Sequence, residues 1–202
     1  MQTSYPQRYF DELYTHNQGD PWCYGQRWYE IRKRQISLAV LPKPKFKSIF
    51  EVGCSTGVMS AQLAQRSDAI YCLDAHPTAL AQAQQNLAAY SHVCLKQGII
   101  PQDLPQQSFD LIVISEVLYY LNASDLTKVM AWLNQQLVNG ACLLACHWRK
   151  RIDDFEFDGD QIHQQLKQHL MARHELGLQD HDFNLDLWWA DTKSVAQHEG
   201  LR

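Results

Sequence analysis

The sequence predicts a doubly wound α/β fold, in which helices cover both faces of a mostly parallel sheet. Short apolar runs alternate with segments of helical period through residues 48–170, which is the pattern of βα units. One run ends in an acid and a glycine turn directly before a helix, at residues 49–64. The 202 residues, 46% of them apolar, are enough for one α/β domain with a buried core. We therefore expect residues 1–202 to form a single domain.

The first part of the chain has helical periodicity. Residues 1–40 predict two helices that are joined by a turn at residues 16–21. Prolines end this part before the first strand. We expect residues 1–45 to form a helical lid and residues 46–202 to form the α/β core.

The core predicts five βα units followed by a β-hairpin. Strands are expected at 48–52, 69–73, 93–95, 109–114 and 141–146, and the fourth is continuously apolar, as in a strand covered on both faces. Further helices are expected after Gly57, from Pro77, from an N-cap at Ser124 and from Asp160. The last part changes to a period of two, which predicts antiparallel strands at 174–178 and 183–189.

The glycine turn after the first strand has the pattern Glu51-x-Gly53-x-x-x-Gly57, with Cys54 and Ser55 between the glycines. A strand, a glycine turn and a helix in this order bring backbone N–H groups to one point, where they can hold a ligand. Gly53 allows a sharp turn, Gly57 allows a close approach to the backbone, and Glu51 can orient the loop or meet a positive ligand. The Gly-x-Gly-x-x-Gly of dinucleotide sites and the Gly-Lys-Ser/Thr of phosphate loops are absent. An ordinary strand–turn–helix junction is the alternative.

This pattern resembles motif I of class I S-adenosylmethionine (SAM) methyltransferases, although the commonest form of that motif has a further glycine at the position of Ser55. The resemblance implies SAM as the cofactor and S-adenosylhomocysteine as the product. It also implies that the doubly wound fold is a seven-stranded mixed sheet of Rossmann-like order.

Asp74 ends the second predicted strand. An acid at this place in a doubly wound sheet accepts hydrogen bonds from the two hydroxyls of an adenosine ribose, whereas the alternative is an acid that stabilises the helix beginning at Pro77. In SAM methyltransferases an acid or Asn after the third strand often reads adenine. This chain has Gly98 and Ile99 there, so we expect their backbone groups to read the base and Ala75 and His76 to flank it.

Three segments, 109–121, 20–22 and 51–54, resemble the nodulation N-methyltransferase (NodS) family. The resemblance covers residues 9–147. That family methylates the free amine of a partly deacetylated chitooligosaccharide, so the resemblance implies methyl transfer to a small-molecule acceptor, preferably an amine, with an amino sugar as one candidate. It also implies that Trp22 and nearby aromatics such as Tyr9 close over SAM, where the face of either ring favours the sulfonium cation. Packing of these rings on the sheet is the alternative.

Polar side chains follow the fourth and fifth predicted strands, at the edge where such sheets bind ligands. Ser115 and Glu116 follow the fourth strand, with Tyr119 and Tyr120 close behind, and His147 follows the fifth. An amine must be unprotonated when it attacks, so we expect Glu116 to bind the ammonium and to take or pass on its proton, and one of the tyrosines to align the acceptor. The alternatives are that Glu116 only starts a helix, that the tyrosines pack in the core and that His147 is structural.

Composition and charge argue against several classes. The net charge of −4 gives no electrostatic case for binding nucleic acid or an anionic membrane surface. No apolar run approaches the ~20 residues of a membrane span, and Met1–Phe10 has no signal-peptide core. Six cysteines without a Cys-x-x-Cys pair, and nine histidines without ligand spacing, predict reduced thiols, no metal site and a cytoplasmic location. The oligomeric state is left open.

Three other functions compete with an N-methyltransferase. A small-molecule O-methyltransferase would use the same motifs. A regulatory or scaffold protein that binds SAM without turnover is kept open by the missing adenine-site acid. A nicotinamide oxidoreductase is disfavoured because its glycine fingerprint is absent.

Overall fold

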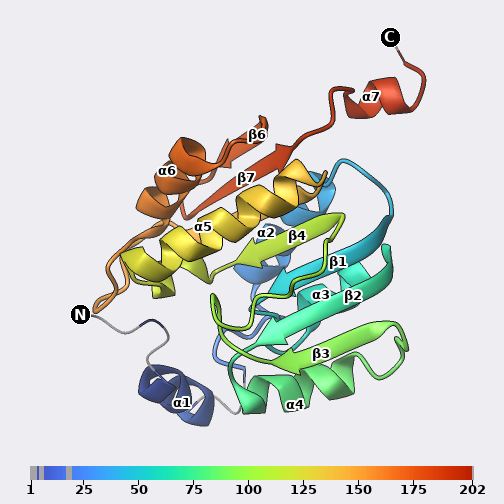
Figure 1. Cartoon of the computed structure of the whole chain (residues 1–202). Helices are drawn as coiled ribbons and strands as arrows, with labels where there is room; N and C mark the ends of the chain where they lie inside the picture. The colour runs from blue at the N-terminus through green and yellow to red at the C-terminus, as the bar shows by residue number, and fades with distance from the viewer. Residues whose placement is uncertain (1–3, 5–6, 17–19, 202) are drawn as a thin grey trace.

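The computed structural model describes residue 4, residues 7–16 and residues 20–201, so part of the turn expected at 16–21 lies outside the described residues. Within them, seven strands form one sheet in the order β3-β2-β1-β4-β5-β7-β6 (Figure 1). The pairings are parallel from β3 to β5, and β7 is antiparallel to both of its neighbours. The predicted seven-stranded mixed sheet is confirmed. The strands are β1 Phe46–Val52, β2 Ser67–Asp74, β3 Val93–Gln97, β4 Leu111–Ser115, β5 Cys142–Trp148, β6 His174–Gln179 and β7 Phe183–Trp189.

Helices cover both faces of the sheet. One face packs against α5 and α6, and the other against α2, α3 and α4. Helix α1 lies off the carboxyl ends of the strands, near α4 (Figure 1). The helices are α1 Gln7–His16, α2 Trp28–Ala39, α3 Val58–Ala64, α4 Pro77–Asn86, α5 Ala123–Val138, α6 Gly159–His169 and α7 Val195–His198, with a 3₁₀ turn η1 at Leu118–Tyr120.

Two helices begin earlier than the sequence predicts. Asn122, rather than Ser124, caps α5, because its side chain accepts a hydrogen bond from the N–H of Asp125. Asp158, rather than Asp160, caps α6, through a reciprocal capping box with Gln161. Both differences arise because several adjacent polar residues are acceptable caps, and only the path of the preceding loop selects one of them.

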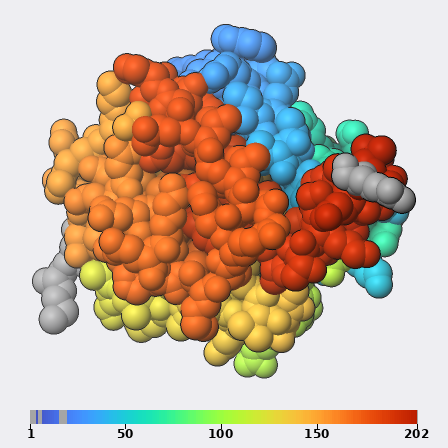
Figure 2. Space-filling model, turned by 90° about the horizontal axis from the view of Figure 1, so that it is seen from above, coloured from blue at the N-terminus to red at the C-terminus, as the bar shows by residue number. Residues whose placement is uncertain are grey.

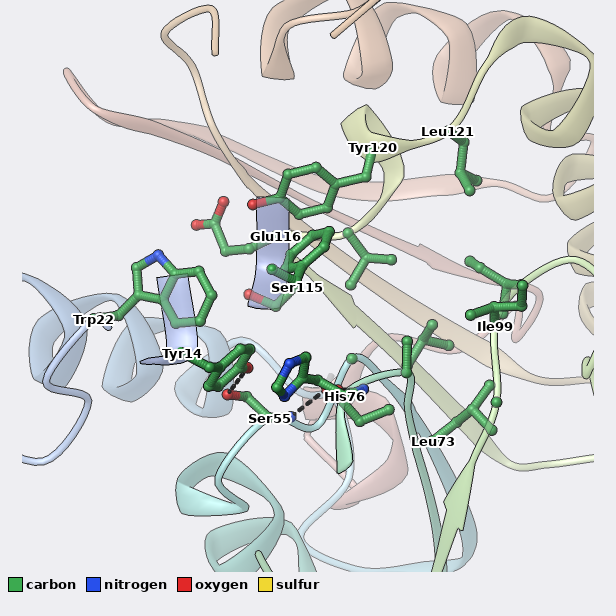
Figure 3. A pocket seen from close by; sticks show the side chains of 18 of the residues that line it. Tyr14, Trp22, Ser55, Leu73, His76, Ile99, Ser115, Glu116, Tyr120 and Leu121 are labelled. Carbon is green, nitrogen blue, oxygen red and sulfur yellow. Dashed lines mark hydrogen bonds between the residues drawn. The ribbon is translucent and has the colours of Figure 1, made fainter. Parts of the chain in front are cut away.

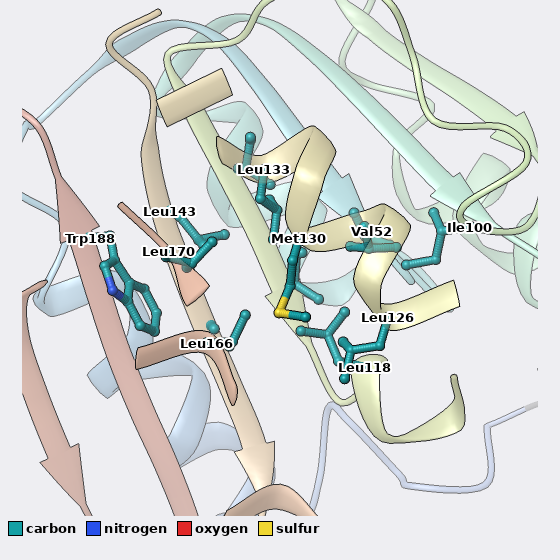
Figure 4. Packing of buried hydrophobic residues seen from close by; sticks show 14 of the residues in the cluster. Val52, Ile100, Leu118, Leu126, Met130, Leu133, Leu143, Leu166, Leu170 and Trp188 are labelled. Carbon is teal, nitrogen blue, oxygen red and sulfur yellow. The ribbon is translucent and has the colours of Figure 1, made fainter. Parts of the chain in front are cut away.

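Apolar packing holds the strands that carry the site. Leu126, Met130 and Leu133 of α5 pack on the sheet, and the cluster continues to Leu166 of α6 and Trp188 of β7 (Figure 4). Each fully buried side chain of this size contributes roughly 1.5–3 kcal/mol. The central strands are therefore a rigid base for the loops that follow them.

The strand order reverses at β1, which pairs with β2 on one side and β4 on the other. Ligands of doubly wound sheets bind in the crevice that this reversal leaves at the carboxyl ends. Seen from above, the C-terminal segment with α6 and β6 (orange) forms much of the surface, and α2 (blue) lies at its edge (Figure 2). In the described part of the chain, every helix is too short or too polar to cross a membrane.

Candidate functional site

A cavity of about 730 Å³ opens at the carboxyl edge of the sheet (Figure 3). It lies between α1 and the segments that follow β1, β2, β3 and β4, which are brought together by the strand reversal. Ten residues that the sequence analysis selects line it: Trp22, Gly53, Ser55, Asp74, Ala75, Gly98, Ile99, Ser115, Glu116 and Tyr120.

A second cavity, of about 490 Å³, adjoins the first beside α2. Its lining is rich in charge, with Glu30, Lys33 and Arg34 from α2 and Glu51 from β1, and it includes Cys54. Five residues line both cavities, and we call them the junction: Tyr24, Gly53, Ser55, Ser115 and Glu116. The two cavities thus adjoin at these five residues, with a largely apolar lining in the first and a charged lining in the second.

The turn after β1 forms one wall of the junction. Gly53 has φ +72° and Ser55 has φ +46°, so Ser55 takes the left-handed conformation at the position where motif I commonly has glycine. Its N–H donates to Asp74 Oδ2 at 2.8 Å, and its hydroxyl lies 2.9 Å from the hydroxyl of Tyr14. These contacts offset the strain of a non-glycine residue, so the departure from the motif leaves the turn intact.

Gly57 does not line either cavity, and the close approach predicted for it is made by α4 instead. A Cβ at this position would lie 3.0 Å from Leu87 Cδ1 and 3.2 Å from Ala83. Gly57 therefore allows α3 and α4 to pack, and its predicted role against a ligand is corrected.

Asp74 lies at the end of β2 with its carboxylate fixed by backbone groups. Oδ2 accepts from Ser55 N–H at 2.8 Å, and Oδ1 accepts from His76 N–H at 2.9 Å. Burial raises the pKa of Asp74, and these two donors oppose the rise. Each carboxylate oxygen keeps a second acceptor site for a ligand hydroxyl.

The backbone N–H groups of Gly98 and Ile99, which are among the groups expected to read adenine, already have partners in the protein. Gly98 N–H donates to the carbonyl of Asp74, and Ile99 N–H donates to Asp103 Oδ2 at 2.8 Å. The side chain of Asp103 is thus turned onto this loop. Both residues remain in the cavity wall, where Leu73, Ile99 and Leu121 give it an apolar surface (Figure 3).

Glu51 is buried and serves the loop. Its Oε2 accepts a hydrogen bond from Ser60 Oγ at 2.5 Å and from Cys72 Sγ at 3.8 Å. Burial raises the pKa of Glu51 to about 7, against the hydrogen bonds of Ser60 and Cys72, and the charge of Asp74 adds to the rise. Glu51 thus titrates near neutrality at the wall of the second cavity.

Replacement of Glu51 by Gln is expected to change how stability depends on pH. The pKa of Glu51 is raised from 4.5 to about 7 in the folded chain, so the native state binds more protons in this window and wild-type stability falls as pH rises through it. The variant lacks this titration and keeps an acceptor for Ser60. Urea unfolding should show equal stabilities below about pH 4.5 and a variant more stable by ~2–3 kcal/mol above about pH 7. Parallel stability curves would contradict the assignment.

Glu116 occupies the junction in a constrained conformation. Its φ is +60°, a left-handed value that costs a non-glycine residue about 1–2 kcal/mol. Three donors hold its carboxylate: Lys33 Nζ at 2.5 Å from Oε1, and Tyr119 Oη at 2.6 Å and Trp148 N–H at 2.8 Å from Oε2. The carboxylate is thus rigidly placed and already paired with a cation.

Tyr9 and Tyr119 lie outside both cavities. Tyr9 makes edge-to-face contacts with Phe10 and Phe155, at 5.2 and 5.4 Å between ring centroids. Phe10, the next residue, lines the cavity in its place. Tyr119 is buried behind Glu116 and donates to it, so the structure gives it a supporting position rather than direct contact with an acceptor.

His147 is fully buried outside the cavities, in a chain of hydrogen bonds. Its Nε2 accepts from the N–H of Leu118 at 3.2 Å, so its proton is on Nδ1, which donates to His163 Nε2 at 3.0 Å. His163 Nδ1 then donates to Asp186 Oδ2 at 2.5 Å. Burial lowers the pKa of His147 well below its ordinary value, and electrostatic interactions with His163 and Lys33 add to this. His147 supports η1, which corrects its prediction as a catalytic residue.

Site residues such as Tyr14 and Arg34 escape the sequence analysis, and His76, which it places beside the purine, has contacts that it does not predict. Tyr14 stacks on His76 with 4.2 Å between ring centroids, and His76 Nε2 lies 3.1 Å from Asp11 Oδ1. His76 Nδ1 and Arg34 Nε are buried and have no hydrogen-bond partner within the described residues. The spacing of four residues between Phe10 and Tyr14 could have placed both on one face of α1, but nothing local distinguishes Arg34 from a surface cation.

The sheet order, the glycine turn after β1 and the acid at the end of β2 define the class I SAM-dependent methyltransferase fold. A family model described as Nodulation protein S (NodS) matches residues 12–144. The chain belongs to the NodS family.

Curated relatives match half of the chain. Nodulation protein S of Sinorhizobium fredii is 33% identical over 103 residues, which are 50% of this chain and 48% of the relative. Nodulation protein S of Bradyrhizobium diazoefficiens is 34% identical over 103 residues, 50% of this chain and 49% of the relative. The chain thus spans about half the length of the curated relatives it matches.

Solved structures match more of the chain. A Pseudomonas syringae protein assigned as a methyltransferase is 39% identical, with a TM-score of 0.71, and the match covers 81% of this chain and 99% of that one. The N-methyltransferase NodS from Bradyrhizobium japonicum, in complex with S-adenosyl-L-homocysteine, has a TM-score of 0.79 at 22% identity, covering 90% of this chain and 96% of that one. At this level of identity, the match to the Bradyrhizobium japonicum enzyme shows a shared fold.

Proposed function

We propose that this chain is a SAM-dependent methyltransferase that methylates an amine of a small molecule. The observation that carries the proposal is the joined pair of cavities, with an acid at the end of β2 in one, a guanidinium in the other and Glu116 where they meet. SAM has its groups in the matching order: a ribose, a sulfonium and a charged amino acid. The complex of the NodS relative with S-adenosyl-L-homocysteine supports the same cofactor.

The first cavity suits the adenosine. Asp74 has an acceptor site on each oxygen for the two ribose hydroxyls, and its orientation is set by Ser55 and His76. His76 Nδ1, which has no partner among the described residues, lies on the same wall for a further polar contact. The apolar residues Leu73 and Ile99 would hold the base between them.

The second cavity suits the amino-acid end. Arg34 donates to the carbonyl of Tyr24 through Nη1 at 3.1 Å, which leaves its buried Nε for a carboxylate. Burial lowers the pKa of Arg34 from its ordinary value, and the charge of Glu30 opposes this. Glu51 lies on the same wall, where its carboxylate would meet the α-amino group.

Methyl transfer requires alignment more than acid–base chemistry. When bound, SAM supplies an activated methyl group, so the protein must hold the acceptor nitrogen in line with it. Glu116 and Ser115 lie at the junction, and Tyr120 lines the first cavity near Glu116, where we propose that the acceptor binds (Figure 3). Trp22 and Phe10, with Tyr14, come from the N-terminal segment and exclude water from this point, which is the role we propose for a lid in residues 1–45.

The charged group at and beside the junction favours an amine acceptor over a negatively charged oxygen acceptor. Glu30 and Glu116 are both close to Lys33, so this group has one more negative than positive charge. A carboxylate acceptor would meet this excess, whereas a positively charged methylamine product would be stabilised by it. An amino sugar fits within this class.

The proposal is tested by calorimetric titration of the purified chain with SAM, S-adenosylhomocysteine and NADH. Micromolar binding of the two adenosyl-sulfur ligands, and none of NADH, is expected. Turnover is then sought by incubating the chain with SAM and panels of amines and amino sugars, with methylated product detected by mass spectrometry. Binding without any methylated product would favour a regulatory or scaffold protein, and failure to bind either sulfur ligand would overturn the proposal.

Replacement of Asp74 by Ala is expected to weaken SAM binding at least about tenfold, because two hydrogen bonds to a buried carboxylate are lost. Asp68→Ala, at the exposed start of the same strand, is the matched control and should leave affinity unchanged. Calorimetry gives both affinities, and circular dichroism confirms that both variants are folded. Unchanged affinity in a folded Asp74→Ala variant would remove Asp74 from the site.

A further inference from the structure

The cation of Lys33 lies between two carboxylates at the wall of the second cavity. Its Nζ is 2.5 Å from Glu116 Oε1 and 3.2 Å from Glu30 Oε2. The Lys33 and Glu30 side chains are only 7% and 8% exposed, and that of Glu116 is 17% exposed. Water therefore screens these charges weakly, and a change of one charge alters the potential in the cavity.

The position of this group makes its charge important. Glu116 lines both cavities, whereas Lys33 and Glu30 line only the second. The group thus extends from the junction, where the sulfur of a bound cofactor would lie, to the wall formed by α2. Its formal charge is −1, because one lysine is paired with two glutamates.

Lys33 is firmly charged. Burial opposes its charge, but the carboxylates of Glu116 and Glu30 outweigh this and raise the pKa of Lys33. The Nζ also lies 4.8 Å from the ring centroid of Tyr29, which favours the cation further. The remaining charges on the second cavity are those of Arg34 and Glu51, which are placed for the amino-acid end.

We propose that Lys33 is a specificity-determining residue that limits the negative charge at the junction and thereby sets the preference of the site for SAM over S-adenosylhomocysteine. The inference rests on the proposed function. SAM carries a sulfonium charge, and S-adenosylhomocysteine has a neutral sulfur at the same place. Without Lys33, the two carboxylates would hold the cation more tightly and the neutral product no better. With Lys33, the site attracts the sulfonium charge of SAM less strongly. In the transition state this charge is leaving the sulfur, so a weaker hold on it in bound SAM lowers the barrier to methyl transfer.

The same argument predicts opposite effects for removing the lysine charge and for removing a glutamate charge. Lys33→Met changes the formal charge of the group from −1 to about −2, and the ratio of the SAM and S-adenosylhomocysteine association constants should rise about fivefold or more. Glu30→Gln changes it to about 0, and the ratio should fall by a similar factor. If Lys33 had only a structural role, Lys33→Met would weaken the binding of both ligands by the same factor and leave the ratio unchanged.

The experiment is calorimetric titration of wild type, Lys33→Met and Glu30→Gln with three probes: SAM, S-adenosylhomocysteine and sinefungin, which carries an ammonium in place of the methylsulfonium. Sinefungin should follow SAM. Lys45→Met is the matched control, because Lys45 is 61% exposed and pairs with Asp68 at the opposite edge of the sheet. Lys33→Arg, which keeps the charge, should restore the wild-type ratio.

The outcomes separate the two proposals. If wild type binds neither SAM nor S-adenosylhomocysteine, the proposed function fails. If wild type binds both, but the ratio stays constant in both variants, the role of Lys33 is overturned while the function stands. If Lys33→Met does not fold, the Glu30→Gln variant decides, because an unchanged or raised ratio in it contradicts the proposal.

Discussion

Replacement of Arg34 by Met is expected to weaken binding of SAM and of S-adenosylhomocysteine by the same large factor, roughly a hundredfold. Both ligands carry the amino-acid carboxylate that we assign to Arg34, and loss of one partner of a desolvated, hydrogen-bonded charge pair costs about 2–5 kcal/mol. The buried Nε–H, which has no partner in the described part of the chain, is the donor that would bind this carboxylate. Calorimetry with both ligands gives the two factors.

Two further variants make this result specific. Arg34→Lys keeps the charge but loses the planar donor pair, so binding should recover only in part. Arg32→Met removes a cation from the same helix, where Arg32 is 41% exposed and pairs with Asp180, and it should bind both ligands as wild type does. Equal losses in Arg32→Met and Arg34→Met would show that helix charge in general, rather than a direct contact, is responsible.

Replacement of Gly53 by Ala is expected to destabilise the fold by about 2–4 kcal/mol and to abolish cofactor binding. Gly53 has φ +72°, where a side chain costs about 1–2 kcal/mol, and a Cβ there would lie 2.4 Å from Val117 Cγ2. Either Val117 or the turn must move, and overpacking of this kind costs about 1–3 kcal/mol. Because the turn forms the junction, a shift there displaces both cavities.

Gly140→Ala is the matched control for backbone strain. Gly140 has φ +94°, and a Cβ there would meet nothing within 4 Å. Urea unfolding of the two variants therefore separates strain, which they share, from the contact with Val117, which only the first has. Equal losses of stability, with cofactor binding intact in Gly53→Ala, would mean that the junction is more adaptable than the geometry indicates.

The order and type of the core elements were predictable because each is a local pattern. The change to a period of two after residue 180 identified β7, which pairs with β5 over its whole length and with β6 from His174 to Gln179. Helix starts were less predictable, because Ser124 and Asn122 are both adequate caps. The strand order came from the family resemblance rather than from periodicity.

The candidate site was predictable where its residues follow strands. Asp74 ends β2 and Glu116 follows β4, and parallel strands bring such residues to one edge. Lys33 and Arg34 were not predictable, because their position depends on how α2 packs against the sheet, over contacts between residues distant in sequence. Ile99 lines the cavity, but the contact of its N–H with Asp103 depends on a loop conformation that no local pattern specifies.

The hydrogen-bonded chain of His147, His163 and Asp186 has a consequence for how these residues tolerate mutation. Each proton in the chain has one direction, from the N–H of Leu118 toward the carboxylate of Asp186, so each histidine needs the group before it and the group after it. Replacing either histidine leaves two buried polar atoms unsatisfied, and replacing the second histidine adds little further cost. Replacing Asp186 also removes the partner of His174 and Lys167. The three positions are therefore strongly coupled, and substitutions there should be non-additive. Apolar replacement of the two histidines is more readily reached by changing both together than one at a time.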